Sequence, residues 1–164
     1  MEFKQKLLLI DGHALFHRAY HAIPGMTSPS GFPTGAIYGF LSMFFKALKD
    51  LNPTHAVVTF DLPGPTFRDK LTADYKAKRK APEEEMTRQL PKLKEILQAL
   101  DIPILEKPGF EADDILGIVS DKTPKDTLNI IVTGDLDLLQ LIDNHTHVYR
   151  FKIGFSDIDS QAGT

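Results

Sequence analysis

The residues of this sequence best suited to chemistry are carboxylates that follow its apolar segments. The run LLLI ends at Asp11, and the run AVVTF leads through to Asp61. In an open α/β sheet, residues just beyond the carboxyl ends of the strands gather at one edge, where such folds bind ligands. A third apolar segment is followed by three acids and a fourth by two, which adds Glu111, Asp113, Asp114, Asp135 and Asp137 to the set.

One acid after one strand is usually a helix N-cap or a turn residue, because its side chain accepts backbone N–H groups. That explanation weakens when all four strand ends carry acids and residues 111–114 hold three of them. Crowded carboxylates repel one another unless a charge offsets them. The usual offset is a hard divalent cation with oxygen ligands, so the pattern predicts Mg²⁺ or Mn²⁺. Two such ions could support phosphodiester hydrolysis.

Other site chemistries fit the sequence poorly. It has no cysteine, which excludes disulfides, thiolate zinc sites and cysteine nucleophiles. Neither a GxSxG elbow nor a GxxxxGK phosphate loop is present. The spacing of His13, His17 and His21 could place three imidazoles on one helical face. We interpret them as half-exposed polar residues rather than as a zinc site. Zinc sites normally have a further type of ligand close by, and the sequence shows none near these histidines.

A basic segment at 62–82 lies beyond Asp61. Cations neutralise phosphates and aromatic rings stack on bases, so a segment that interleaves both suits a nucleic-acid strand. Lys76 and Arg79 are one helical turn apart and could face one phosphate. The plainer interpretation is a solvated charged loop. The basic residues are Arg68, Lys70, Lys76, Lys78, Arg79 and Lys80, against Asp69 and Asp74, with Phe67 and Tyr75 among them.

These residues must be positioned by alternating strands and helices. Strands are expected at 6–10, 55–60, 102–106, 128–133 and 146–151, and helices at 13–22, 34–50, 84–100, 111–120 and 136–143. Such alternation indicates an α/β fold with a mostly parallel sheet. A loop is expected at 24–33 and an irregular tail at the C-terminal end. Pro91 could kink its helix or mark where that helix starts.

Two helices show a clear apolar stripe that is expected to face the core. In the helix at 34–50 the stripe is Ile37, Phe40, Leu41, Phe44, Phe45 and Leu48. In the helix at 84–100 it is Met86, Leu90, Leu93, Leu97 and Leu100.

The whole chain has the composition of a single globular domain. It has 164 residues, 42% of them apolar, and a net charge of −3. It lacks the roughly 20-residue apolar run that spans a bilayer, and it lacks a signal peptide. A cytoplasmic protein with no membrane partner is therefore expected.

Five blocks resemble the N-terminal 5′-nuclease domain of bacterial DNA polymerase I, the related phage 5′-nucleases and the wider flap endonuclease class. They cover about residues 5–155 in the same order. The blocks read LLLIDGHALFHRAYHA, PTGAIYGF, VVTFDLPGPTFRDKLTADYKAKR, GFEADDILG and VTGDLDLLQL. FEADD together with the TxDxDLLQL pattern makes the resemblance specific.

The resemblance implies a PIN-like (resolvase-like) fold and a metal-dependent nuclease that cuts 5′ flaps and 5′ ends of duplex DNA in replication and repair. It implies that Asp11, Asp61, Glu111 and Asp113 bind a first ion and that Asp135 and Asp137 face a second, with Asp114 as a further match. It also implies a basic helical arch at about 62–82. There Lys76 and Arg79 act in catalysis, and the DNA contacts are Arg68, Tyr75, Lys76, Lys78, Arg79 and Lys80.

The sequence departs from the family pattern at its end. The family continues with an acidic block reading TGDxSDNxPG and a DNA-binding helix–hairpin–helix, neither of which is present. We therefore expect a nuclease domain at 1–155, a tail or truncated end at 156–164, and a weak second metal site. The natural chain could continue into a polymerase.

Three alternatives stay open from the residues alone. A small PIN-type ribonuclease shares the acidic sheet edge but usually lacks a basic arch. A DNA-binding remnant would keep the acids without cutting. A receiver or phosphatase domain also places acids at strand ends, but a phosphatase would need DxD where this chain has Asp11-Gly-His13.

Overall fold

Strands and helices alternate along most of the chain, as expected. The computed structural model describes residues 3–67, 83–151 and 158–161. The elements are β1 (Gln5–Asp11), α1 (Gly12–Ala22), α2 (Gly35–Leu51), β2 (His55–Thr59), α4 (Glu84–Ala99), β3 (Ile104–Leu105), α5 (Ala112–Lys122), β4 (Thr127–Val132), the 3₁₀-helix η1 (Asp137–Leu141), β5 (Thr146–Phe151) and β6 (Ile158–Gln161).

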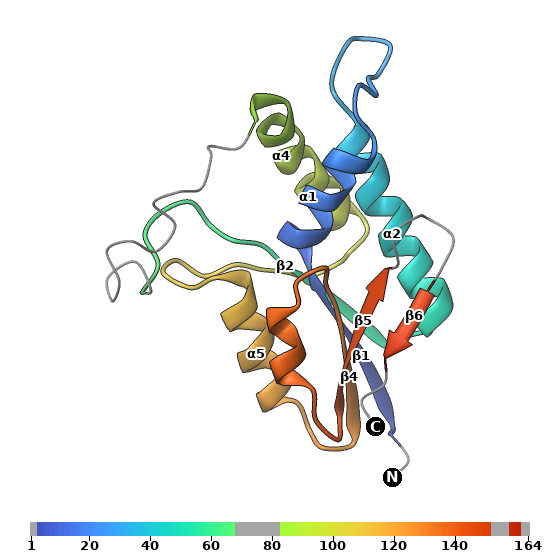
Figure 1. The fold of residues 1–164 in the computed structure, drawn as a ribbon, viewed down its shortest axis with the longest axis vertical. Helices are drawn as coiled ribbons and strands as arrows, with labels where there is room; N and C mark the ends of the chain where they lie inside the picture. Colours follow the sequence, from blue (N-terminus) through green and yellow to red (C-terminus); the bar gives the residue numbers. More distant parts are fainter. Residues whose placement is uncertain (1–2, 68–82, 152–157, 162–164) are drawn as a thin grey trace.

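One sheet runs through the molecule in the order β3-β2-β1-β4-β5-β6. All its pairings are parallel except that of β6, which runs antiparallel to β5. The central strand is β1, where Leu9 lies opposite Val57 on one side and Ile131 on the other. The chain therefore has the mostly parallel α/β sheet that the alternation predicts (Figure 1).

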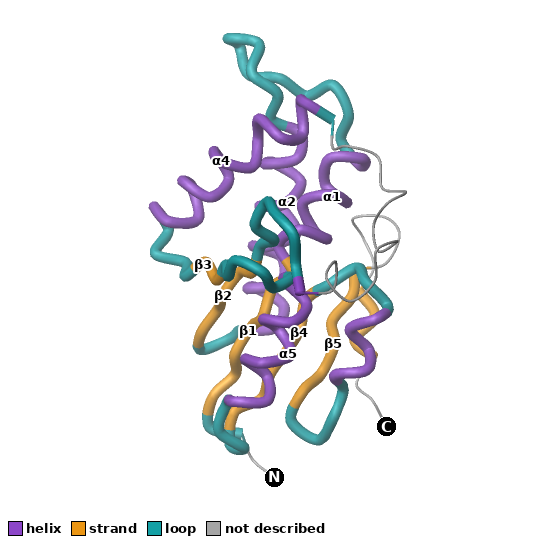
Figure 2. Tube along the Cα trace, turned by 90° about the vertical axis from the view of Figure 1, so that its left-hand side faces the viewer, coloured by secondary structure: helices purple, strands orange, loops and turns teal. Residues whose placement is uncertain are grey.

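Each face of the sheet carries its own core, because neighbouring strand residues point to opposite faces. Leu8 and Ile10 of β1 pack with the buried residues of α1, α2 and α4. Leu9, between them, packs on the other face with Leu116 of α5 and Leu138 of η1. Figure 2 shows α5 apart from the group formed by α1, α2 and α4. Asp11 is the N-cap of α1 in the larger group, and Glu111 is the N-cap of α5 on the other face.

A buried polar side chain joins two helices of the larger core. The Oε1 atom of Gln89 in α4 accepts hydrogen bonds from the backbone N–H groups of Ala36 (2.9 Å) and Ile37 (3.3 Å). These groups belong to the first turn of α2, whose N-cap residue Thr34 makes no side-chain cap. Gln89 therefore caps α2 from a neighbouring helix, a role that the apolar stripe did not predict.

Two stripe residues expected in the core are exposed. Phe45 is 49% exposed, because Met43 and Ala47 turn the buried face of α2 away from it. Leu100 is 44% exposed, because α4 ends at Ala99 and the chain turns through Asp101, which has a φ of 56°. The helix expected at 84–100 is confirmed as α4, which begins at Glu84, so Pro91 lies inside it and does not mark its start.

Three other elements differ from the expected ones. The strand at 102–106 has only the two residues of β3, flanked by Pro103 and Pro108, which have no N–H to donate. The helix at 136–143 is a single 3₁₀ segment, the usual form of so short a piece. The C-terminal end, expected as an irregular tail, contains β6. Within the described ranges, no helix is long and apolar enough to cross a bilayer.

Candidate metal centre at the carboxyl edge of the sheet

The first candidate ligand is buried where β1 meets α1. Asp11 is 3% exposed, and its Oδ1 accepts a hydrogen bond from the Ala14 backbone N–H at 3.0 Å, which caps α1. Its Oδ2 accepts a second bond from the Thr133 hydroxyl at 2.7 Å. Burial raises the pKa of Asp11, although these two donors act in the opposite direction. Asp11 therefore has both a structural role as N-cap and an electrostatic cost that a cation would offset.

Gly12 allows α1 to begin directly against β2. A Cβ atom at this position would lie 2.5 Å from the Thr59 carbonyl oxygen and 2.7 Å from the Phe60 ring. Neither of those atoms can move aside easily, since one is backbone and the other belongs to a buried ring. The close approach keeps Asp11 beside the end of β2, which leads to Asp61.

Asp61 connects β2 to the N-terminus of α5. Its Oδ1 accepts a hydrogen bond from the Ala112 backbone N–H at 2.6 Å. The first N–H groups of a helix carry a partial positive charge that favours a carboxylate there. This bond places Asp61 beside Glu111 and Asp113, although Asp61 precedes them by 50 and 52 positions in sequence. Sequence reasoning grouped them through the sheet edge and did not predict the bond itself.

Asp113 is the electrostatic centre of the cluster. Its pKa is raised to about 7, first by burial and then by the negative charges of its neighbours. Those neighbours are Asp11, Asp135, Asp61 and Glu111. Carboxylates from β1, β2, the start of α5 and the end of β4 therefore act on one another at this edge, as the strand-end pattern predicted.

Thr133 links the β4 loop to this group and was missed in the sequence analysis. Its buried hydroxyl donates to Asp11 and accepts a hydrogen bond from the Asp135 backbone N–H at 2.9 Å. The Asp135 Oδ1 in turn accepts from the Asp137 backbone N–H at 2.9 Å. Both of these loop acids are exposed. A threonine directly after an apolar strand and before Gly-Asp was the available signal for this role.

Two further predicted ligands, Asp114 and Asp137, adjoin other acids of the set. The Oδ2 of Asp114 accepts a hydrogen bond from the Glu111 backbone N–H at 3.0 Å, which caps the helix. Asp137 lines a hollow with Ala14, Arg18 and Asp135. Neither Asp114 nor Asp137 is among the groups whose charge raises the pKa of Asp113.

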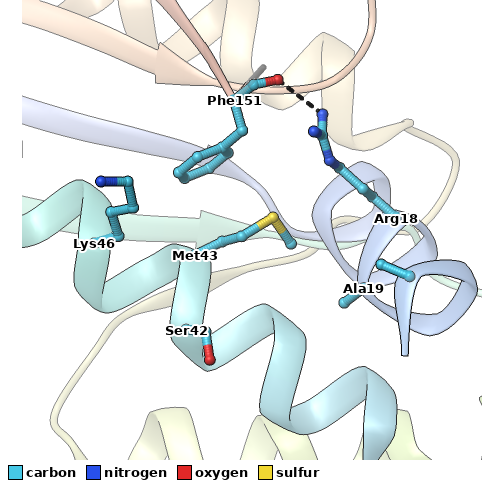
Figure 3. Close-up of a pocket in the computed structure, with 7 residues that line it drawn as sticks. Arg18, Ala19, Ser42, Met43, Lys46 and Phe151 are labelled. Atoms are coloured by element: carbon cyan, nitrogen blue, oxygen red, sulfur yellow. Dashed lines mark hydrogen bonds between the residues drawn. The ribbon is translucent and has the colours of Figure 1, made fainter. Parts of the chain in front are cut away.

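The side chains of a histidine, His13, and an arginine, Arg18, also border the acids. The Nδ1 of His13 is buried, makes no hydrogen bond within the described part of the chain and lies 4.0 Å from the Asp61 Oδ2. Arg18 lies one turn further along α1, and its Nη1 donates to the Phe151 carbonyl at 3.0 Å (Figure 3). That contact ties the end of β5 to α1 beside a cavity of about 280 Å³. Both residues belong to the block DGHALFHR, and neither was among the predicted site residues.

The predicted DNA-contacting residues lie outside the described residues. They are Arg68, Tyr75, Lys76, Lys78, Arg79 and Lys80. The structure therefore describes the segment only up to Phe67 and from Glu83 onward.

The donors of this edge suit a hard cation by their chemistry. Every candidate ligand is a carboxylate, and the raised pKa of Asp113 shows that its own charge is opposed by its surroundings. Among the described residues, no group of three or more Asp, Glu or His side chains lies close enough together to hold a metal ion. The carboxylates are thus within electrostatic reach of one another without forming a closed coordination shell.

Comparison with known proteins gives one family across nearly the whole chain. The family described as "5'-3' exonuclease, N-terminal resolvase-like domain" matches residues 6–162. A "5'-3' exonuclease" of Aquifex aeolicus is 41% identical over 143 residues, which are 87% of this chain and 50% of that protein. A "DNA polymerase I" of Chloroflexus aurantiacus is 44% identical over 145 residues, which are 87% of this chain and 15% of that protein. The chain thus spans half or less of the length of these relatives.

The fold also matches a solved nuclease structure. The flap endonuclease of bacteriophage T5, in a complex with DNA and metal ions, superposes with a TM-score of 0.67 at 17% identity. The match covers 90% of this chain and 55% of the phage protein. The likeness confirms the resolvase-like, PIN-type fold expected from the sequence.

Proposed function

Since the chain belongs to the 5′-3′ exonuclease family through its N-terminal resolvase-like domain, we propose that it hydrolyses phosphodiester bonds of DNA at 5′ ends and 5′ flaps. The observation that carries the proposal is the cluster around Asp113, where carboxylates from four elements act on one another. Such a cluster suits divalent cations more than it suits acyl transfer or phosphate binding by a glycine-rich loop.

The proposed ligands of a first Mg²⁺ or Mn²⁺ ion are Asp11, Asp61, Glu111 and Asp113. Asp135 and Asp137 face the position of a second. Bound ions of this kind supply a nucleophilic water and stabilise charge on the leaving oxygen. Asp114, whose Oδ2 accepts the Glu111 backbone N–H, is proposed as a further ligand.

The described residues around these ligands hold them in place. The Thr133 hydroxyl and the Ala14 N–H fix both oxygens of Asp11, and the Ala112 N–H fixes one oxygen of Asp61. Asp11 and Asp61 therefore keep a defined orientation, and the Asp61 Oδ2 lies 4.0 Å from the His13 Nδ1. Ligands held this way need little rearrangement when an ion binds.

The proposed DNA contacts lie in the basic segment and rest on the sequence match. We propose that Arg68, Tyr75, Lys76, Lys78, Arg79 and Lys80 contact the DNA strand, with Lys76 and Arg79 stabilising charge at the reacting phosphate. Lys76→Ala and Arg79→Ala should then slow cleavage by at least about tenfold, since a lost charge stabiliser costs that much or more. The melting temperature should stay within about 2 °C of wild type, because exposed charges contribute little to stability. A much lower melting temperature would instead show a structural role.

The relatives suggest the biological setting. One of them is a DNA polymerase I, and the region that matches this chain makes up 15% of that protein. We propose that this chain serves the same kind of step, removal of RNA primers and damaged 5′ ends, next to a polymerase in the same chain or acting with it. The cytoplasmic location expected from the sequence stays a prediction.

A cleavage assay tests the proposed function. The substrate is a 5′-flap DNA duplex labelled at its 5′ end, incubated with Mg²⁺ or Mn²⁺ and, separately, with EDTA. We expect a short labelled product that requires the cation and that is absent with Asp113→Asn. The matched control is Asp121→Asn, an exposed acid at the other end of α5.

The alternatives give different results in the same assay. A small ribonuclease would cut an RNA hairpin faster than the DNA flap. A DNA-binding remnant would shift the flap substrate in a binding assay without forming product. Either result would contradict the proposal.

A further inference from the structure

A second feature beside the carboxylates has the chemistry of a base-binding surface. An open hollow of about 360 Å³ lies between the loop before α5, the helix α5 and the 3₁₀-helix η1. Asp113 and Asp114 line its inner side, so it borders the candidate metal centre. The other lining residues are Phe67, Phe110, Gly117, Ile118, Leu138, Gln140 and Leu141.

Two aromatic rings from separate loops form one wall of this hollow. The centroids of Phe67 and Phe110 are 5.8 Å apart, and the ring planes are inclined by 57°. The Phe67 backbone N–H donates to the Gly109 carbonyl at 3.0 Å, which fixes the two loops against each other. Phe67 is 39% exposed, so part of its ring faces solvent although the loops are held. We call Phe67, Phe110 and Lys107 the aromatic shelf.

Lys107 gives the shelf a positive charge. Its Nζ lies 4.5 Å from the centroid of the Phe110 ring. The turn that carries it is closed by a hydrogen bond from the Phe110 N–H to the Lys107 carbonyl at 3.1 Å. A cation beside two aromatic rings is the combination that binds single-stranded nucleic acid, because the cation neutralises phosphate and the rings stack on bases.

The floor of the hollow is apolar and partly exposed. Ile118 of α5 is 48% exposed, although it lies on a helix whose inner face is well buried. Gly117 adds no side chain there, and a Cβ atom at that position would only make ordinary contact with Leu141 at 3.5 Å. A flat apolar ring placed over this floor would cover surface that is otherwise open to water.

From these observations we propose that the aromatic shelf holds one nucleobase of the DNA strand whose phosphate lies at the carboxylate cluster. The base stacks on Phe67 with its edge toward Phe110 and Ile118, and Lys107 neutralises an adjacent phosphate. The proposal rests on the proposed function and deepens it, because it assigns a position for a particular nucleotide. A base drawn aside in this way would turn its phosphodiester toward Asp113.

The test measures binding of a fluorescent 5′-flap duplex in Ca²⁺, under conditions in which no product forms. Phe67→Leu should weaken binding by about tenfold, the usual effect of losing one stacking partner, and Phe67→Tyr should restore it. Phe110→Leu, in the other loop, should act in the same direction. The matched control is Phe45→Leu, an exposed phenylalanine of α2 on the opposite side of the sheet, which should bind as wild type does.

Abasic substitution locates the base. One nucleotide at a time near the flap junction is replaced by an abasic site, in wild type and in Phe67→Leu. At the position of the stacked base, removal of the base should weaken binding by the wild type to the level of Phe67→Leu. The same removal should not weaken binding by Phe67→Leu further, because that variant already lacks the stacking ring. If Phe67→Leu weakens binding by the same factor at every position, the shelf holds no base and the inference is wrong, while the proposed nuclease function stands. If wild type neither binds nor cuts any flap, both are overturned.

Discussion

At the scale of single residues, the charge on Asp113 is the most informative property of the site. Its pKa is about 7 in the folded chain and near 3.8 in the unfolded chain. Between these two pH values the folded chain keeps a proton on Asp113 that the unfolded chain has lost. Between about pH 4 and pH 7 the folded state therefore binds more protons, and stability falls as the pH rises. The penalty is complete above pH 7 and absent below pH 4.

Asp113→Asn should therefore stabilise the metal-free protein at pH 8 but not at pH 4. The gain should be roughly 1–2 kcal/mol, once the shift is discounted for the solvent that reaches this half-buried group. Urea unfolding in EDTA at both pH values measures it. Asp121→Asn, on the exposed end of the same helix, serves as control. Equal effects of the two substitutions would show that the cluster does not strain the fold.

Thr133 offers a second test at this scale. Thr133→Val keeps the shape but removes the hydroxyl that donates to Asp11, so one oxygen of a buried carboxylate loses its partner. We expect a loss of about 1–3 kcal/mol in the free energy of unfolding. The control is Thr127→Val at the other end of β4, where the buried hydroxyl makes no hydrogen bond to any described residue and its removal should cost nothing. If both substitutions cost the same, the Thr133 bond is not what holds Asp11.

At the scale of elements, the site depends on helices that begin at the right places. α1 is capped by Asp11, α5 begins beside Asp61, and α2 is capped by Gln89 of α4. The last contact fixes the larger helical layer over the sheet. It uses a side chain buried among apolar residues, which a search for apolar periodicity overlooks.

Gln89→Leu should leave two N–H groups at the start of α2 without an acceptor. We expect it to destabilise the protein by about 1–3 kcal/mol with an unchanged denaturant slope, because the fold itself is kept. Gln98→Leu, an exposed glutamine of the same helix, should change stability by less than about 0.5 kcal/mol. A neutral Gln89→Leu variant would mean that solvent or Thr34 caps α2 instead.

At the scale of the whole molecule, the sequence predicted the fold class and the gathering of the acids. Period and spacing located β1, α1, β2, α5, β4 and β5 to within two residues, because each has a clear apolar pattern and a polar end. β3 and η1 were less predictable, since short elements are set by their neighbours more than by their own residues. β6 could not be predicted, because it depends on pairing with β5.

The site also has parts that could be predicted from the sequence and parts that could not. The acids could be recognised because each follows an apolar segment in the sequence. In a parallel sheet the carboxyl ends of the strands lie at one edge, so acids at those ends come together. The groups that hold them could not be found this way, because the Thr133 hydroxyl and the Ala112 backbone N–H contact residues that are distant in sequence. The aromatic shelf is likewise formed by two loops that lie more than 40 residues apart in sequence.

Binding of Mn²⁺, followed by electron paramagnetic resonance, tests the central claim most directly, since free and bound Mn²⁺ give different signals. We predict saturable binding at pH 8 that weakens as the pH is lowered toward 5, because the carboxylate ligands take up protons and the pKa of Asp113 is raised to about 7. Asp113→Asn should weaken binding by at least about tenfold, and Asp121→Asn should leave it unchanged. Absence of saturable binding by the wild-type chain at millimolar Mn²⁺, or equal binding by the two variants, would contradict the claim that these strand-end carboxylates form a metal centre.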